Sequence, residues 1–355
     1  MQEQAAYVAH ADATMSIRAA IDIGSNTVHL VIARCLPDDL EILEDELELL
    51  RIGESVNATG SITPQKREEA IATICKYKAL VERYTTEPIL VVATEAIRKA
   101  NNSQEFIEAV LARTGLVVQI IDGTIEAMLT FYGATYEHTQ SSLPPSTLGV
   151  MDLGGGSMEL VIAKQGQIDW STSLPIGSGW LHDRYLPTDP PTADELDIAH
   201  TFLSTYFEGL RIKPPLPLLI ITGGSANTLL YLAQHTSDDP MESSRLTHDD
   251  IVRCMTLLET LSAAEIARRY AIAPARAQIL PAGAMIIQTM MERLGLDEVR
   301  VSAHGIREGA LLARTRYGED WLEQLQSRQK EPQEAGERAA HEKQRSDRSS
   351  NRCHW

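Results

Sequence analysis

With 355 residues, 43% of them hydrophobic and 23% charged, the chain can bury a large core, and at roughly 100–200 residues per domain it is expected to form two domains. Its net charge is −17; the segment 327–355 carries seven basic and five acidic residues, which leaves −19 for the rest, and so acidic a body is not expected to bind nucleic acid nonspecifically. No apolar run reaches the ~20 residues of a membrane span, so no membrane association is expected.

The first regular segment of the chain follows an expected N-terminal extension, residues 1–17. This extension lacks the basic start and apolar core of a signal peptide, so a cytoplasmic location is expected. Residues 21–34 read IDIGSNTVHLVIAR: an apolar strand that ends in Asp22, a turn of small residues, and a second strand with period-two alternation.

Helices and strands alternate after this hairpin. Thr63 as N-cap and Pro64 at the first helical position predict a helix over 64–83. Short apolar strands are expected at 89–93 and 116–121, with helices over 103–113 and from Thr124 onward. This alternation is typical of a mixed α/β sheet.

The hairpin recurs 130 residues downstream. Residues 151–164 read MDLGGGSMELVIAK and match the first copy at six of fourteen positions, including Asp22/Asp152 and Gly24/Gly154. Two hairpins can resemble each other by chance, but the matched Asp-x-Gly turns favour a duplication. Two similar lobes facing each other imply a cleft between them.

The second half repeats the alternation. A strand over 216–221 meets a Thr-Gly-Gly-Ser turn and a helix over 226–233; further helices are expected over 247–261 and 274–294, and a last strand over 299–302. Apolar periodicity stops near residue 325, so the tail 327–355 is expected to be disordered. The four cysteines form no CxxC pair and are expected to be inert thiols: Cys35, Cys75, Cys254 and Cys353.

The two matched turns are candidate phosphate-binding loops. Glycines let backbone N–H groups approach an anion, and hydroxyls and amides add donors. The aspartate at each strand end, Asp22 or Asp152, can hold hydrated Mg²⁺. The alternative is a pair of tight turns in which each aspartate bonds its own backbone. The candidate phosphate-binding residues are Gly24, Ser25, Asn26 and Thr27 in the first loop, and Gly154, Gly155, Gly156 and Ser157 in the second.

A third strand–turn element precedes the helix over 226–233. Its residues Gly223, Gly224 and Ser225 could bind a nucleoside or a second phosphate at the helix N-terminus. A Gly-Gly sequence is also often only a turn, and both interpretations stay open.

Eight segments make the chain similar to one enzyme family. It resembles the exopolyphosphatase/guanosine pentaphosphate phosphohydrolase family from about residue 18 to residue 316. The resemblance implies a duplicated actin/sugar-kinase/Hsp70-like (ribonuclease H-like) α/β fold with two lobes and mixed sheets. The matching segments are AAIDIGSNTVHLVIA, VVATEAIRKANN, IIDGTIEAMLTFYGA, GVMDLGGGSMELVIA, SLPIGSGWL, ITGGSANTL, ILPAGAMII and VSAHGIREGALL.

The resemblance also assigns roles to individual residues. It makes Glu126 the base that deprotonates the attacking water, and Asp152 and Glu159, with Asp22, the acidic residues that handle water and a Mg²⁺ or Mn²⁺ ion. Arg98 would clamp a phosphate. Taken alone, Glu126 could be an ordinary first-turn glutamate, Arg98 a surface arginine and Glu159 a solvent-facing strand residue.

The chain also departs from the family pattern. Ile125 stands where many members have a second glutamate, and Trp180 lies near a position where an arginine is common. The longer members carry a C-terminal helical domain with an HD-type metal motif, which is not expected in a chain of this length. His182-Asp183 and His248-Asp249 are isolated pairs and are not expected to bind metal.

These observations predict a phosphohydrolase that removes the terminal phosphoryl group from short or medium inorganic polyphosphate, from pppGpp, or from both. Lobe I is expected over 18–134, completed by a C-terminal helix at 305–326, and lobe II over 135–304. Two alternatives stay open: a non-catalytic sensor that binds an alarmone or nucleotide on the same fold, and a kinase or ATPase. The main substrate and the oligomeric state, a homodimer included, also stay open.

Overall fold

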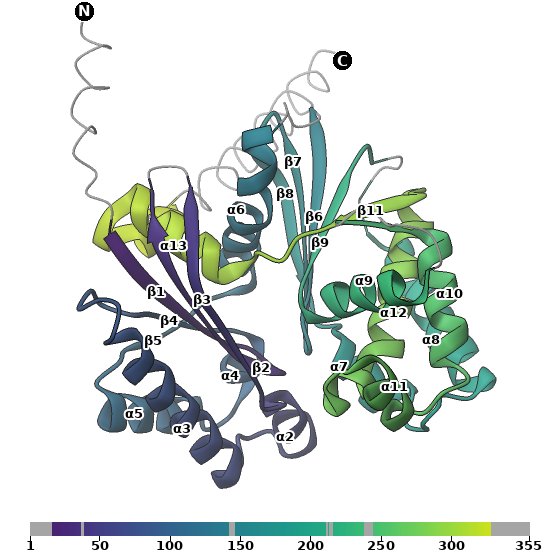
Figure 1. Ribbon diagram of the computed structural model, residues 1–355, viewed down its shortest axis with the longest axis horizontal. Coiled ribbons are helices and arrows are strands. Elements are labelled where there is room, and N and C mark those ends of the chain that lie inside the picture. The colour runs from purple at the N-terminus through teal and green to yellow at the C-terminus, as the bar shows by residue number, and fades with distance from the viewer. Residues whose placement is uncertain are drawn as a thin grey trace, which may run out of the picture.

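The computed structural model describes residues 16–36, 39–141, 146–210, 212, 216–237 and 244–327. Apart from residues 16, 17 and 327, the predicted N-terminal extension and the predicted disordered tail lie outside these ranges. The described chain forms two lobes, each built on one mixed sheet, as Figure 1 shows.

The first lobe is a five-stranded sheet in the order β3-β2-β1-β4-β5. Its strands are β1 (Ser16–Ile23), β2 (Thr27–Cys35), β3 (Leu40–Leu49), β4 (Leu90–Ala93) and β5 (Val118–Ile120). Alternate residues of β1 point to opposite faces: Ala19, Ile21 and Ile23 pack in one hydrophobic core, and Ala20 in another. The helices of the first core are α2 (Ile52–Thr59), α3 (Pro64–Val81), α4 (Glu95–Lys99) and α5 (Ser103–Thr114).

The second lobe repeats the first. Its sheet has the order β10-β11-β9-β6-β7-β8. The strands β8-β7-β6-β9-β11 correspond in order to β3-β2-β1-β4-β5 of the first sheet, and β10 is an additional edge strand. Asp22 pairs with His29 across β1 and β2, and Asp152 pairs with Glu159 at the same offset of 130. The strands are β6 (Thr147–Leu153), β7 (Met158–Lys164), β8 (Gln167–Leu174), β9 (Leu219–Thr222), β10 (Arg245–Thr247) and β11 (Glu298–Val301). The predicted duplicated actin-like fold is therefore confirmed.

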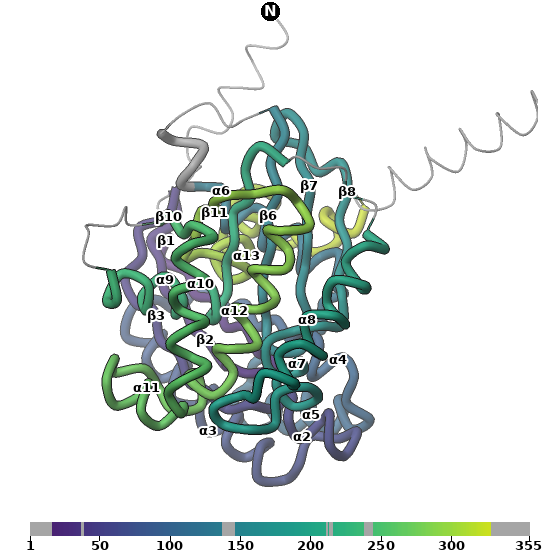
Figure 2. Tube along the Cα trace, turned by 90° about the vertical axis from the view of Figure 1, so that its right-hand side faces the viewer, coloured from purple at the N-terminus to yellow at the C-terminus, as the bar shows by residue number. Residues whose placement is uncertain are grey.

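The helices of the second lobe pack on one face of its sheet around the largest core of the chain. They are α7 (Ser178–Tyr185), α8 (Ala193–Glu208), α9 (Gly224–Thr236), α10 (His248–Leu258), α11 (Ala263–Tyr270) and α12 (Pro274–Leu294). Figure 2 shows α8 and α10 beside the long α12, whose side chains are largely buried. Among the described residues no single helix is long and apolar enough to cross a membrane; only the bent pair α11 and α12 passes that test by length and composition.

Two helices cross between the lobes. α6 (Gly123–Ser141) follows β5 of the first lobe, yet Ala127, Phe131 and Ala134 pack on strands of the second sheet. α13 (Ile306–Tyr317), which a short 3₁₀ helix follows (Gly318–Asp320), packs on β1 and β2 of the first. The predicted lobe boundary at 134/135 thus falls inside α6, a helix that serves both lobes.

Glycines allow α6 and α13 to touch. A Cβ atom at Gly309 would lie 1.8 Å from the Leu129 carbonyl oxygen, and one at Gly133 would lie 1.9 Å from that of Gly305. Both obstacles are backbone atoms, which cannot swing aside as a side chain can. The backbones of the two helices are therefore in contact where they cross. This contact fixes the position of one sheet relative to the other.

Most predicted elements are confirmed, including the Thr63 cap, whose side chain accepts a hydrogen bond from the Lys66 N–H, and α12, whose bounds match the prediction. The strand expected over 116–121 is shorter, Val118–Ile120. Eight elements were not predicted from the sequence: β3, β8, β10, α2, α4, α7, α8 and α11.

We predict that Gly309→Ala lowers the free energy of unfolding by about 3 kcal/mol, because the added methyl group can fit only if the crossing helices separate. Urea unfolding measures this. Gly209→Ala is the matched control: Gly209 has a right-handed backbone, φ −68°, and its Cβ would meet only the Tyr206 carbonyl, at 3.3 Å. Equal losses in the two variants would contradict the account of the crossing.

Candidate active site

A cleft of about 620 Å³ lies between the lobes, where the ends of β1, β6 and β9 face the start of α13. The structure brings most of the predicted site residues to its wall. These are Asp22, Gly24, Ser25, Asn26, Thr27, Glu126, Asp152, Gly154, Gly155, Ser157, Glu159, Gly223 and Gly224. Three predicted residues lie off this wall: Arg98, Gly156 and Ser225.

The two predicted phosphate loops have the same backbone geometry. The Gly24 N–H donates to the Thr27 carbonyl at 2.9 Å, and the Gly154 N–H donates to the Ser157 carbonyl at 3.0 Å. The loops also touch across the cleft: a Cβ atom at Gly155 would lie 2.3 Å from the Asn26 side chain, and one at Gly156 would lie 2.7 Å from Ser25 Oγ. A residue larger than glycine would therefore displace the Asn26 side chain at position 155, or the Glu95 and Ser25 side chains at position 156.

Neighbouring segments hold the carbonyl groups of both loops. The Asn26 carbonyl accepts from the N–H groups of Leu50 and Arg51, both at 2.8 Å. The carbonyls of Gly154 and Gly155 accept from the N–H groups of Ser178 and Trp180 at 3.0 and 2.9 Å. With these acceptors occupied, the loops are fixed, and the anion-repelling oxygens are turned to protein partners.

The third loop reaches the same place from β9. Gly223 has φ +101°, a conformation that favours glycine, and a Cβ atom there would lie 2.4 Å from the Leu153 carbonyl oxygen and 3.1 Å from Asp152 Oδ1. Gly223 is the N-cap residue of α9, so the N-terminus of that helix faces the cleft. Ser225 lies behind it, fully buried.

Four carboxyl groups converge on the cleft: those of Asp22, Glu126, Asp152 and Glu159. The last three are almost fully buried. Thr130 Oγ1 donates to Asp152 at 2.9 Å, and Ser173 Oγ donates to Glu159 at 2.7 Å. Burial, followed by the nearby Asp152 charge, raises the pKa of Glu159 to about 8. Burial and then the charge of Glu159 raise the pKa of Glu126 well above its usual value. The site therefore retains protons that isolated carboxyl groups would lose.

Arg98 lies beside Glu126. Its Nη1 atom donates to the Ile121 carbonyl at 2.6 Å and lies 3.3 Å from Glu126 Oε2. The guanidinium opposes the rise in the pKa of Glu126. The structure thus places Arg98 as a partner of the predicted base, behind the wall of the cleft.

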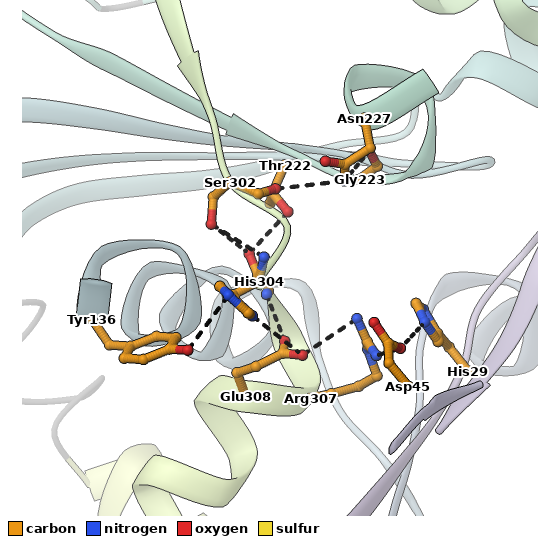
Figure 3. Close-up of polar contacts among 11 residues, drawn as sticks. His29, Asp45, Tyr136, Thr222, Gly223, Asn227, Ser302, His304, Arg307 and Glu308 are labelled. Carbon is orange, nitrogen blue, oxygen red and sulfur yellow. Dashed lines mark hydrogen bonds and ion pairs between the residues drawn. The ribbon is translucent and has the colours of Figure 1, made fainter. Parts of the chain in front are cut away.

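The start of α13 contributes a cleft residue that was not predicted from the sequence, although it lies in the matching segment VSAHGIREGALL. Arg307 lines the cleft, donates to Asp45 at 2.8 Å and lies 3.4 Å from Glu308 (Figure 3). Burial raises the pKa of Asp22 to about 7, although the positive charge of Arg307 acts to lower it. Arg307 is therefore a fixed positive charge facing the acidic cluster.

Two buried polar atoms of the first loop have no hydrogen-bond partner within the described part of the chain: Asp22 Oδ1, an acceptor, and Asn26 Nδ2, a donor. Buried polar groups are normally paired, so such atoms point to an absent ligand. A phosphate oxygen would suit the amide, and a cation would suit the carboxylate.

The residues fit a magnesium site of a particular kind. No group of three His, Cys, Asp or Glu side chains among the described residues is arranged to hold a metal by itself. Mg²⁺ usually needs only one or two carboxylates, with water and substrate phosphates as its other ligands. Asp22 and Asp152, which end equivalent strands of the two lobes, fit that requirement.

The departures from the family pattern have structural explanations. Ile125 is buried between α6 and α13. Trp180 packs against Tyr185 and Phe202 and does not line the large cleft. Asp183 binds Arg51 at 3.2 Å, and His248 lies 3.5 Å from Glu292, so both histidine–aspartate pairs have structural contacts.

Comparison with known proteins supports this architecture. Residues 31–317 match the model of the Ppx/GppA phosphatase family. Exopolyphosphatase 2 of Mycobacterium tuberculosis is 30% identical over 314 residues, which cover 83% of this chain and 97% of that protein. The solved PPX-GPPA enzyme of Aquifex aeolicus is 31% identical, with a TM-score of 0.70, covering 84% of this chain and 100% of the other.

A solved exopolyphosphatase from Cytophaga hutchinsonii shares the fold, with a TM-score of 0.74 at 24% identity, covering 84% of this chain and 98% of the other. The match to the family model spans most of the described chain, from within β2 through the second phosphate loop to the end of α13, while the first phosphate loop precedes it. This protein is therefore a member of the Ppx/GppA phosphatase family.

Proposed function

We propose that this protein is a phosphohydrolase that removes the terminal phosphoryl group from short or medium inorganic polyphosphate, from pppGpp, or from both, with the help of a divalent cation. One observation carries the proposal: a buried carboxyl group of raised pKa, Glu126, faces a cleft walled by two phosphate-type loops. The names of the relatives support hydrolysis of phosphoanhydride bonds.

In the proposed mechanism the loops bind the terminal phosphates through their N–H groups and the Asn26 amide. Glu126 accepts a proton from a water molecule, whose oxygen forms a bond to the terminal phosphorus. The bridging P–O bond breaks, and orthophosphate leaves a chain that is one unit shorter. Glu126 acts in its ionised form, and its raised pKa makes that carboxylate a stronger base than an ordinary one. Arg98 orients Glu126, and we propose that it also clamps a phosphate as the cleft fills.

We propose that Asp22 and Asp152, with Glu159 beside them, hold Mg²⁺ or Mn²⁺. When bound, the cation neutralises charge on the phosphoryl oxygens. Arg307 contributes a second, permanent positive charge at the same wall. These charges allow an acidic protein to accept a polyanion in this cleft.

The preference for short substrates is supported by the surroundings of the cleft. β3 forms one edge of the cleft and lines it with one acidic residue, Asp45, and with Leu47 and Leu49. Leu47 and Tyr231 also line the cleft, and each is more than a third exposed. A long polyphosphate needs a continued row of basic side chains, and this wall does not provide one among the described residues.

We predict that Glu126→Gln lowers the rate of phosphate release from tripolyphosphate by at least about 100-fold, because positioned proton transfer typically contributes ~10²–10⁴-fold. Substrate binding should change little, since glutamine has the same shape. Glu105→Gln, on the exposed face of α5, is the control and should keep the wild-type rate. A Glu126→Gln variant with more than about a tenth of that rate would exclude the residue as the base.

The metal proposal predicts a pH-dependent thermal shift. Burial raises the pKa of Asp22 to about 7, so protons compete with Mg²⁺ below that pH and no longer compete above it. The increase in Tm on adding Mg²⁺ should therefore be larger at pH 8 than at pH 5.5. Asp152→Asn should reduce the increase at pH 8, and phosphate release should stop in excess EDTA. Full activity in EDTA would contradict the proposal.

Substrate length is tested by initial rates of phosphate release at equal concentrations of chain ends. Tripolyphosphate and chains of a few tens of units should be hydrolysed faster than chains of several hundred units, because the β3 edge of the cleft offers a long polyanion no basic side chains. The same assay on pppGpp and ATP measures nucleotide use. Fast hydrolysis of the longest chains, with none of tripolyphosphate or pppGpp, would show that the preference is wrong.

A further inference from the structure

The segment between β3 and α2 supports the first phosphate loop. The N–H groups of Leu50 and Arg51 donate to the Asn26 carbonyl, and the Gly53 N–H donates to the Ser25 carbonyl at 2.7 Å. A Cβ atom at Gly53 would lie 3.0 Å from the Ser25 Cβ, so the two backbones are in direct contact. Any movement of this segment would move Ser25 and Asn26.

The helix α7 supports the second phosphate loop in the same way. Its Ser178 and Trp180 N–H groups hold the carbonyls of Gly154 and Gly155. A Cβ atom at Gly177, which precedes the helix, would lie 2.4 Å from the carbonyl carbon of Gly155. The position of α7 therefore sets the position of the second loop.

The side chain of Arg51 joins these two supports across the lobes. Its Nη2 atom donates to Asp183 Oδ1 of α7 at 3.2 Å, and its Nη1 atom donates to Gln278 Oε1 of α12 at 3.1 Å. Only 14% of the Arg51 side chain is exposed. The cavity that Arg51, Asp183 and both loops enclose has a volume of about 20 Å³, so the lobes are closed at this point.

Arg51 also has a backbone conformation that is rare for its residue type. Its φ and ψ are 52° and 47°, in the left-handed region, although it carries a long side chain. Strained conformations of this kind persist where surrounding contacts hold them, and they are concentrated at functional sites. Here the strain turns the side chain from the supporting segment toward the other lobe.

We propose that Arg51 is a positioning residue, which holds the two phosphate loops at their working separation by tying the support of the first loop to α7 and α12. The proposal deepens the proposed function and rests on it. The substrate must contact both loops at once, and Arg51 keeps them in that arrangement before the substrate arrives. Without this tie the closed arrangement is less populated, and the apparent affinity falls in proportion to that population.

Asp183→Ala tests the proposal without disturbing the Arg51 backbone. We expect KM for tripolyphosphate to rise about tenfold, as charge-assisted hydrogen bonds warrant, while kcat stays within about twofold because saturating substrate closes the lobes again. A purely structural role would lower kcat and leave KM unchanged. Asp197→Ala, which removes an exposed aspartate from α8, is the matched control and should behave as wild type.

Two further measurements complete the test. Arg51→Ala combined with Asp183→Ala should raise KM no further than Arg51→Ala alone, because both changes break one link. Small-angle X-ray scattering without substrate should give a larger radius of gyration for Asp183→Ala than for wild type. A KM within about twofold of wild type, an unchanged radius, or effects that multiply would each overturn the proposal. If wild type releases no phosphate, the proposed function fails, while the scattering comparison still tests the link.

Discussion

The contact between the two phosphate loops, one from each lobe, is the constraint on which the rest of the structure depends. Gly155 lies against the Asn26 side chain and Gly156 against those of Glu95 and Ser25, so a side chain on either glycine would push these groups out of place. This contact makes one composite site from two copies of a hairpin. The close crossing of α6 and α13 holds the sheets behind the loops, so the separation of the loops is determined from both sides.

The electrostatics of the site follow from that closeness. Bringing the two strand-end aspartates together, with Glu126 and Glu159 beside them, places four carboxyl groups in a poorly solvated cleft, where ionisation is unfavourable. Arg98 and Arg307 offset part of this effect. The negative charge that the arginines do not offset gives the site its affinity for protons and, in the proposed function, for a divalent cation. In the proposed function, the base Glu126 and the anion-binding wall are then consequences of one arrangement.

Much of this architecture could be predicted from the sequence because its signals are local. The repeated Asp-x-Gly hairpins lie within fourteen residues each, and they predicted both the duplication and the two loops. Capping boxes at Thr192/Glu195 and Ser262/Glu265 are equally local signals for α8 and α11. β3 was hidden by its acidic residues, which interrupt the apolar alternation of this edge strand.

The missed site residues depend on contacts between distant parts of the chain. Arg307 meets Asp45 across 262 positions, and Arg51 meets Asp183 across 132. No window of a single sequence contains such pairs. Arg98 illustrates the same limit: its predicted motif was found, but its contact with Glu126 appeared only when α4 and α6 were placed together.

The central claim is that water attacks the terminal phosphorus in this cleft. Hydrolysis of tripolyphosphate in ¹⁸O-labelled water, followed by mass spectrometry of the products, tests it most directly. The account predicts one ¹⁸O atom in each released orthophosphate and none in the pyrophosphate that remains. Label in the pyrophosphate, or transfer of the phosphoryl group to another acceptor without label, would contradict it.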